Sequence, residues 1–120
     1  MLTPAKRKLI LYKGAKFDPG WTWKAAGVPV DLTGCTARMQ VRADVDSPDV
    51  LLDLTTENGG IILGGAAGTI DLWVGATDTT AITWEGGVWA LEIQYATGPD
   101  DVDRLIEGSI SVSPEVPRDD

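Results

Sequence analysis

One segment of the sequence, from Pro29 to Arg42, constrains the fold more than any other, because it joins a turn to a strand with two different faces. Residues 31–34, Asp-Leu-Thr-Gly, pair a short polar side chain that can bond the local backbone with a glycine that is free to take a positive φ. From there apolar and polar residues alternate strictly: Cys35, Ala37, Met39 and Val41 on one face, and Thr36, Arg38, Gln40 and Arg42 on the other. This period of two predicts a half-buried strand that belongs to a scaffold rather than to an active site.

Shorter patterns of the same kind recur along the chain. They predict strands at residues 8–12, 21–24, 50–54, 61–63, 69–74, 88–97 and 105–112. The segment 88–97 is the most hydrophobic and is expected to be central. Residues 76–84 break the alternation, and Thr77 or Asp78 there is expected to cap a single helical turn. About seven or eight strands without a long helix predict an antiparallel all-β sandwich or barrel.

The glycine-rich stretch 64–68 has two interpretations. A phosphate-binding loop leads from a strand into the N-terminus of a helix. Here an alternating segment, residues 69–74, follows instead. We therefore expect a hairpin connection between two strands.

Length and composition set the domain organisation. A chain of 120 residues is expected to form one domain, residues 1–120, with a basic N-terminal arm (1–8) and a proline-containing C-terminal tail (114–120). No stretch approaches the roughly 20 apolar residues that cross a bilayer, and the first residues do not resemble a secretory signal. We expect a soluble protein made in a cytoplasm. The single cysteine, Cys35, is expected to be a small buried side chain.

Charge is distributed unevenly along the chain. Residues 1–24 carry six cations and one carboxylate, whereas the other 96 residues carry four cations and 17 carboxylates. Such polarity can steer one subunit onto another, although the charges can equally be solvated faces of one fold. An acidic body is repelled by phosphates, so no nucleic-acid partner is expected.

Few residues carry recognisable chemistry. The sequence has no histidine, which excludes Ser-His-Asp and Cys-His catalysis and histidine-ligated metals. The remaining candidates are a hydrolytic carboxylate pair drawn from Glu57, Glu85, Glu92 and Glu107, and calcium ligands from residues 44–49 or 100–103. Nothing brings two of these glutamates together, and the aspartates are typical of solvated turns. We therefore expect no enzyme, no catalytic residue, no metal and no cofactor.

The five tryptophans are candidate contact residues. Trp89 is expected in the core, whereas Trp73 is expected to face outward beside Asp71. Trp21 and Trp23 share one strand face. They could lie in the core, form a subunit contact or provide a platform that binds sugars.

The order of these signals resembles small β-sandwich virion proteins of tailed bacteriophages. The resemblance is carried by an apolar-basic opening strand, Gly14–Phe17 before the Trp segment, Val30–Gly34 with its following strand, Gly68-Thr69-Ile70, the Ala76–Ile82 turn and the closing strand Leu105–Ile110. It covers nearly the whole chain and is similar to baseplate, tail-fibre and head-decoration domains. It implies an antiparallel, immunoglobulin-like β-sandwich of about seven to eight strands with one short helical turn.

The resemblance also implies a function. The prediction is a non-enzymatic virion structural protein, a tail or baseplate accessory that is assembled in the host cytoplasm and docks on other virion proteins as a homo-oligomer. A head-decoration protein and a carbohydrate-binding module for host glycans are the alternatives; no membrane partner is expected. The candidate interaction residues are Lys6, Arg7, Lys8, Trp21, Trp23, Arg38, Arg42 and Trp73.

Overall fold

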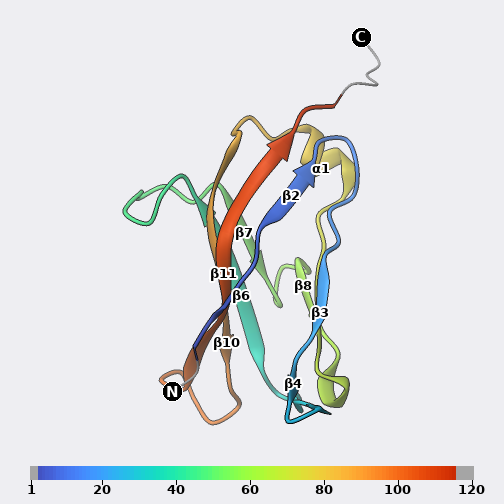
Figure 1. The fold of residues 1–120 in the computed structure, drawn as a ribbon, viewed down its shortest axis with the longest axis vertical. Helices are drawn as coiled ribbons and strands as arrows, with labels where there is room; N and C mark the ends of the chain where they lie inside the picture. Colours follow the sequence, from blue (N-terminus) through green and yellow to red (C-terminus); the bar gives the residue numbers. More distant parts are fainter. Residues whose placement is uncertain (1–2, 116–120) are drawn as a thin grey trace.

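The computed structural model describes residues 3–115, which form two β-sheets packed face to face (Figure 1). The larger sheet has the order β1-β11-β10-β6-β7, with β2 also paired to β11. Its strands are β1 (Ala5–Lys6), β2 (Leu9–Tyr12), β6 (Thr36–Arg42), β7 (Leu52–Thr55), β10 (Gly86–Gln94) and β11 (Val102–Ser113). Strands β1 and β2 run parallel to β11, so the larger sheet is mixed rather than wholly antiparallel.

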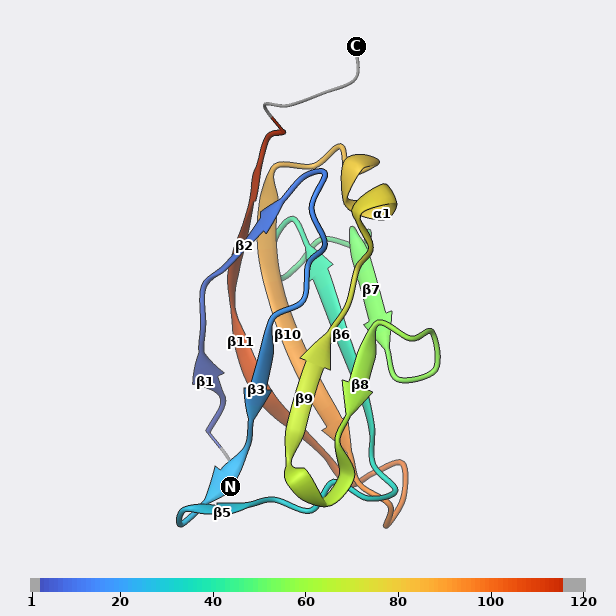
Figure 2. The same cartoon turned by 90° about the vertical axis from the view of Figure 1, so that its right-hand side faces the viewer.

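The smaller sheet has the order β3-β9-β8 and covers one face of the larger sheet (Figure 2). Its strands are β3 (Gly20–Thr22), β8 (Ile61–Leu63) and β9 (Thr69–Leu72), while β4 (Lys24–Ala25) and β5 (Val28–Pro29) form a separate hairpin. The glycine-rich stretch connects β8 to β9 through a 3₁₀ turn, η1 (Gly65–Ala67). The predicted hairpin connection is therefore confirmed.

The predicted turn at residues 31–34 and the strand that follows it are confirmed. Asp31 Oδ1 accepts hydrogen bonds from the Thr33 backbone N at 3.0 Å and from Thr33 Oγ1 at 2.6 Å, and Gly34 takes φ 80°. These bonds lower the pKa of the Asp31 carboxyl. Along β6, buried and more exposed residues then alternate as predicted. Cys35 lies before the first paired residue and is half-buried rather than buried, and its partial burial raises the pKa of the thiol.

A β-bulge interrupts the pairing of the two longest strands. The register between β10 and β11 shifts between Leu91 and Glu92. As a result, Leu105 and Ile106 are both buried although they are consecutive in sequence. The strict alternation expected for residues 105–112 is therefore wrong at this point.

The predicted helical turn is present as α1 (Ala76–Thr80), but neither Thr77 nor Asp78 caps it. The N-cap residue is Gly75, without a side-chain hydrogen bond. Thr79 is fully buried instead, and its hydroxyl accepts from Gly14 N at 3.1 Å and donates to Ala15 O at 2.9 Å. This side chain therefore fixes α1 to the segment between β2 and β3.

Two tryptophans connect the sheets through the core. The rings of Trp21 on β3 and Trp89 on β10 stack with centroids 5.9 Å apart and planes 15° apart. Trp89 is 3% exposed and its Nε1 donates to Ser109 O at 3.1 Å, so its predicted core position is confirmed. Trp73 is 46% exposed, as predicted.

The predicted terminal segments are only partly described. Residues 5 and 6 of the expected N-terminal arm form β1 and pair with β11, so this part is an edge strand of the larger sheet. Residues 1–2, and residues 116–120 of the expected C-terminal tail, lie outside the described residues.

Candidate functional site

The face of the larger sheet that points away from the smaller sheet gathers most of the charged side chains that the strands carry. We call it the outer face. It is formed by the alternate residues of β6, β7, β10 and β11 that do not enter the core: Arg38, Gln40, Arg42, Asp53, Val88, Ala90, Glu92, Arg104 and Glu107. The bulge in β10–β11 contributes to this set, because burying Leu105 and Ile106 together leaves Arg104 and Glu107 on the same side.

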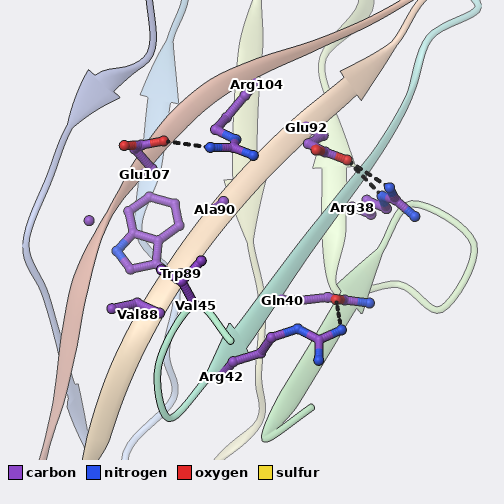
Figure 3. Close-up of a pocket in the computed structure, with 11 residues that line it drawn as sticks. Arg38, Gln40, Arg42, Val45, Val88, Trp89, Ala90, Glu92, Arg104 and Glu107 are labelled. Atoms are coloured by element: carbon purple, nitrogen blue, oxygen red, sulfur yellow. Dashed lines mark hydrogen bonds and ion pairs between the residues drawn. The ribbon is translucent and has the colours of Figure 1, made fainter. Parts of the chain in front are cut away.

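A shallow groove of about 530 Å³ runs over this face (Figure 3). Val88, Ala90 and Gly108 give it an apolar floor. Arg42 and Val45 line it on the side of β6, and Arg104 and Glu107 line it on β11. Side chains of three neighbouring strands and of the β6–β7 loop thus converge on one open surface.

Ion pairs hold the charged side chains of the groove in place. Arg38 approaches Glu92 Oε1 with Nε at 2.9 Å and Nη2 at 2.8 Å. Glu107 lies between two cations, because Lys6 Nζ bonds one of its oxygens and Arg104 Nη1 bonds the other at 3.2 Å. The hydrogen bonds from Lys6 and then Arg104 lower the pKa of the Glu107 carboxyl. Glu107 is therefore a carboxylate held between two cations, Lys6 and Arg104.

Arg42 joins the groove to the loop between β6 and β7. Its Nη1 donates to Ser47 O at 2.8 Å and its Nη2 donates to Gln40 Oε1 at 3.1 Å. The loop projects from the outer face in Figure 1, and Val45 within it is 82% exposed. Arg42 thus supports a protruding apolar side chain at the side of the groove.

A second hollow of about 330 Å³ continues along the same face. Arg38 and Glu92 line both hollows, so their ion pair lies between them. The second hollow is also lined by Gln94, Pro99 and Val102, where β10 ends and β11 begins. The candidate surface therefore extends along much of the length of the sheet.

The structure brings together some of the candidate interaction residues and separates others. Arg38 and Arg42 lie in the groove, and Lys6 reaches it through Glu107. Arg7 and Lys8 are exposed on the chain between β1 and β2. The tryptophan candidates lie elsewhere: Trp21 on β3 packs against the core, as does the half-buried Trp23, and Trp73 follows β9.

Sequence reasoning missed the groove residues Ala90, Arg104 and Glu107 as interaction residues, and it considered Glu92 and Glu107 only as hydrolytic carboxylates. Each of these glutamates is ion-paired with an arginine on an exposed face. No sequence pattern could have found the groove, because it depends on the cross-strand register, which places Ala90 opposite both Gln40 and Glu107.

Among residues 3–115, no group of three or more Cys, Asp or Glu side chains is placed to hold a metal ion. Within the same described residues, none of the helices has the length and apolar character to span a membrane.

Comparison with known proteins gives matches only in structure. No family model matches the sequence, and no curated protein matches it. A solved structure of the extracellular domains of the voltage-gated sodium channel beta4 subunit matches with a TM-score of 0.52 at 8% identity, over 97% of this chain and 98% of the other. The fold is an immunoglobulin-like β-sandwich. A second match, from work on multimeric cell-adhesive interactions of the VGSC beta subunits, has a TM-score of 0.50 at 8% identity and covers 90% and 92% of the two chains.

These matches confirm the predicted fold class and correct the predicted function. The beta4 structures are described as parallel homodimers that explain a role in cell–cell adhesion. These two matching structures are thus domains of sodium channel beta subunits studied for cell adhesion, and not virion proteins. The prediction of a tail, baseplate or head-decoration protein, with its glycan-binding alternative, is therefore wrong. The resemblance of the sequence to phage sandwich proteins, and the location that it implied, stay untested predictions.

Proposed function

We propose that this chain is a non-catalytic protein-recognition domain that associates with a second copy of itself through the outer face. The observation that carries the proposal is the mixture of charges around the apolar floor of the groove, where Arg38 and Arg104 lie beside Glu92 and Glu107. In a twofold dimer the same patch must meet itself, so it needs groups of both signs. This face is self-complementary in that sense.

The chemistry of the face suits a protein partner. Protein interfaces combine an apolar centre with a polar rim and are enriched in arginine. Val88 and Ala90 supply the centre here, while three arginines and the exposed Val45 surround it. A small-molecule site instead encloses most of its ligand. The open form of this groove favours a broad, flat partner.

The state of Glu107 supports a role without catalysis. A carboxyl that acts as a general acid near neutral pH needs a raised pKa. The bonds from Lys6 and Arg104 lower the pKa of Glu107 instead. We therefore infer that Glu107 serves in ion pairing rather than as a proton donor at neutral pH.

The structural neighbours support self-association. The beta4 extracellular domains, which share this fold at 8% identity, are described as homodimers. From that description we carry over to this chain only the use of the sandwich to bind its own copy.

Sedimentation velocity over a range of concentrations tests the proposal. We expect the native chain to dimerise and Ala90→Arg, which places a long cation on the apolar floor, to remain monomeric. Ala66→Arg is the matched control, because Ala66 is an exposed alanine in η1, away from the outer face. A monomeric native chain at millimolar concentration would contradict the proposal, as would a folded Ala90→Arg variant that still dimerises.

A further inference from the structure

We infer that the two copies pair in parallel, with the twofold axis along the strands, so that the basic edge of each copy faces the acidic side of its partner. The basic edge is Lys6, Arg7 and Lys8, and the acidic side is Asp44, Asp46 and Asp49 of the β6–β7 loop with Asp53 of β7; all are exposed. The inference rests on the proposed self-association and adds its geometry.

The strand register places these charges at opposite ends of the same rows. Lys6 pairs with Glu107, Glu107 with Ala90, Ala90 with Gln40, and Gln40 with Asp53. This row crosses the outer face from β1 to β7 through the floor of the groove. It begins with a cation and ends with an anion, with Ala90 at its centre.

A neighbouring row repeats the arrangement. Leu9 pairs with Ile110, so Lys8 lies level with Ser109, which pairs with Val88. Val88 pairs in turn with Arg42, the last residue of β6. Beyond Arg42 the chain enters the loop that carries Asp44, Asp46 and Asp49. The second row therefore also leads from a cation to a cluster of anions.

The sequence keeps the two sides distinct. Residues 3–13 contain no aspartate or glutamate, and residues 43–103 contain no lysine or arginine. In Figure 2, β1 and β2 lie at the left side of the sandwich and β7 lies toward the right. The two edges of the sheet thus carry opposite charge, whereas the strands between them, β11, β10 and β6, together carry both signs.

A twofold axis can bring this face onto itself in two simple ways. An axis along the strands places the β1 edge of one copy opposite the β7 edge of the other, so that Lys6 and Lys8 meet the acidic side of the partner. An axis across the strands places each edge of one copy opposite the same edge of the other, so that the basic edge meets the basic edge and Asp53 meets Asp53. Like charges placed together across an interface oppose association. The charge division therefore selects the parallel pairing.

Charge reversal tests which edges meet. We expect Arg7→Glu/Lys8→Glu alone, and Asp46→Lys/Asp49→Lys alone, each to weaken the dimer by about tenfold or more, because each leaves like charges facing. Combining all four changes in one chain should restore dimerisation, since opposite charges face again. Dimers that are unaffected by either pair of changes would overturn the parallel arrangement.

A distance measurement tests the orientation directly. In a Cys35→Ser background, a spin label on Gln94→Cys, at the exposed end of β10, reports on its counterpart in the other copy. Parallel copies place the two labels across the gap of about 10 Å between packed sheets, plus the length of the labels. Antiparallel copies centred on Ala90 separate them by about 26 Å more along the strands, at roughly 3.3 Å per residue. That longer distance would overturn the inference.

The outcomes separate the two proposals. A dimer that Ala90→Arg disrupts but the charge reversals do not would keep the proposed function and reject the parallel geometry. A native chain that never associates would reject both.

Discussion

At the scale of single residues, the stacked pair Trp21 and Trp89 forms a direct contact between the two sheets. Trp89 is fixed on both sides, by the stack and by its hydrogen bond to Ser109 O. Aromatic pairs add about 0.5–1.5 kcal/mol beyond the area that they bury. The pair therefore fixes how the two sheets lie against each other.

Trp21→Ala should reduce the free energy of unfolding by about 3 kcal/mol, because it removes a large, partly buried side chain that packs against the core and uncovers one face of the Trp89 indole. Trp73→Ala is the matched control, since Trp73 is 46% exposed, and it should change stability by less than about 0.5 kcal/mol. Urea unfolding monitored by circular dichroism measures both. Equal losses in the two variants would show that the stack has no special role.

Tyr95 gives the fold a dependence on alkaline pH. Burial, and then the hydrogen bond from its hydroxyl to Asp103 Oδ2 at 2.9 Å, raise the pKa of Tyr95 from its ordinary value of 10.0 to about 12. The folded state therefore holds this proton more tightly than the unfolded state. Its contribution to stability is fully present below pH 10 and is lost as the pH rises toward 12.

Absorbance titration of tyrosinate should detect this late ionisation in the native chain, and Asp103→Asn should bring it to lower pH. Tyr95→Phe should remove the corresponding loss of stability between pH 10 and 12. A Tyr95 that ionises at the same pH in the native and Asp103→Asn chains would show that the hydrogen bond does not contribute.

At the scale of elements, strands with one buried face could be predicted from sequence, whereas pairing could not. The alternation after Gly34 specifies β6 because only one face is apolar. Strand β1 has no such pattern: Ala5 and Lys6 are both exposed, and they form a strand only because β11 offers an unpaired edge. The bulge at Leu91/Glu92 likewise depends on the partner strand.

The candidate site was likewise predictable only within single strands and not across strand pairs. Arg38 and Arg42 could be predicted because they lie on the polar face of a strand that the sequence identifies. Their neighbours Glu92 and Glu107 belong to other strands, and only the register brings them together. Sequence patterns therefore located one strand of the outer face but not the groove.

Gly108 shows how closely one element approaches another. A Cβ at this position would lie 1.7 Å from Arg7 O, where the chain passes from β1 to β2. Gly108→Ala should therefore displace this edge and cost about 1–3 kcal/mol of stability. Hydrogen exchange should show faster loss of the Arg7 amide proton, which normally bonds Glu107 O at 2.9 Å.

Gly75→Ala is the control for this change, because its φ is −71° and no atom lies within 4 Å of the added Cβ. It should cost less stability than Gly108→Ala, the loss being that of a weaker N-cap of α1, and should leave the exchange of Arg7 nearly unchanged. If Gly108→Ala behaves like Gly75→Ala, then the close approach at Gly108 does not hold the edge in place.

At the scale of the whole molecule, the predicted function failed where the predicted fold succeeded. The resemblance to phage proteins was carried by the order of strands and turns, and such an order belongs to an architecture that unrelated proteins share. A single fold supports many functions, so the site must supply the functional argument.

The net charge of −8 predicts opposite effects of salt on folding and on association. Screening reduces repulsion within the acidic molecule, so added salt should raise the melting temperature of the monomeric Ala90→Arg variant. The same screening weakens attraction between the basic edge and the acidic side, so the dissociation constant of the native dimer should rise. Calorimetry and sedimentation at low and high salt measure the two effects. A dimer that strengthens with salt would contradict this expectation, because it would show that repulsion between two copies of net charge −8 outweighs the attraction between the basic edge and the acidic side.

The stacked tryptophans also determine how the domain responds to its chemical surroundings. In antibody domains of this architecture a disulfide joins the two sheets. Here Cys35 is the one cysteine of the chain, and the connection between β3 and β10 is made by two indole rings. An indole stack has no oxidation state that a thiol reductant can change. We therefore expect dithiothreitol to leave the melting temperature unaltered, so that the same sandwich holds together in reducing and in oxidising compartments.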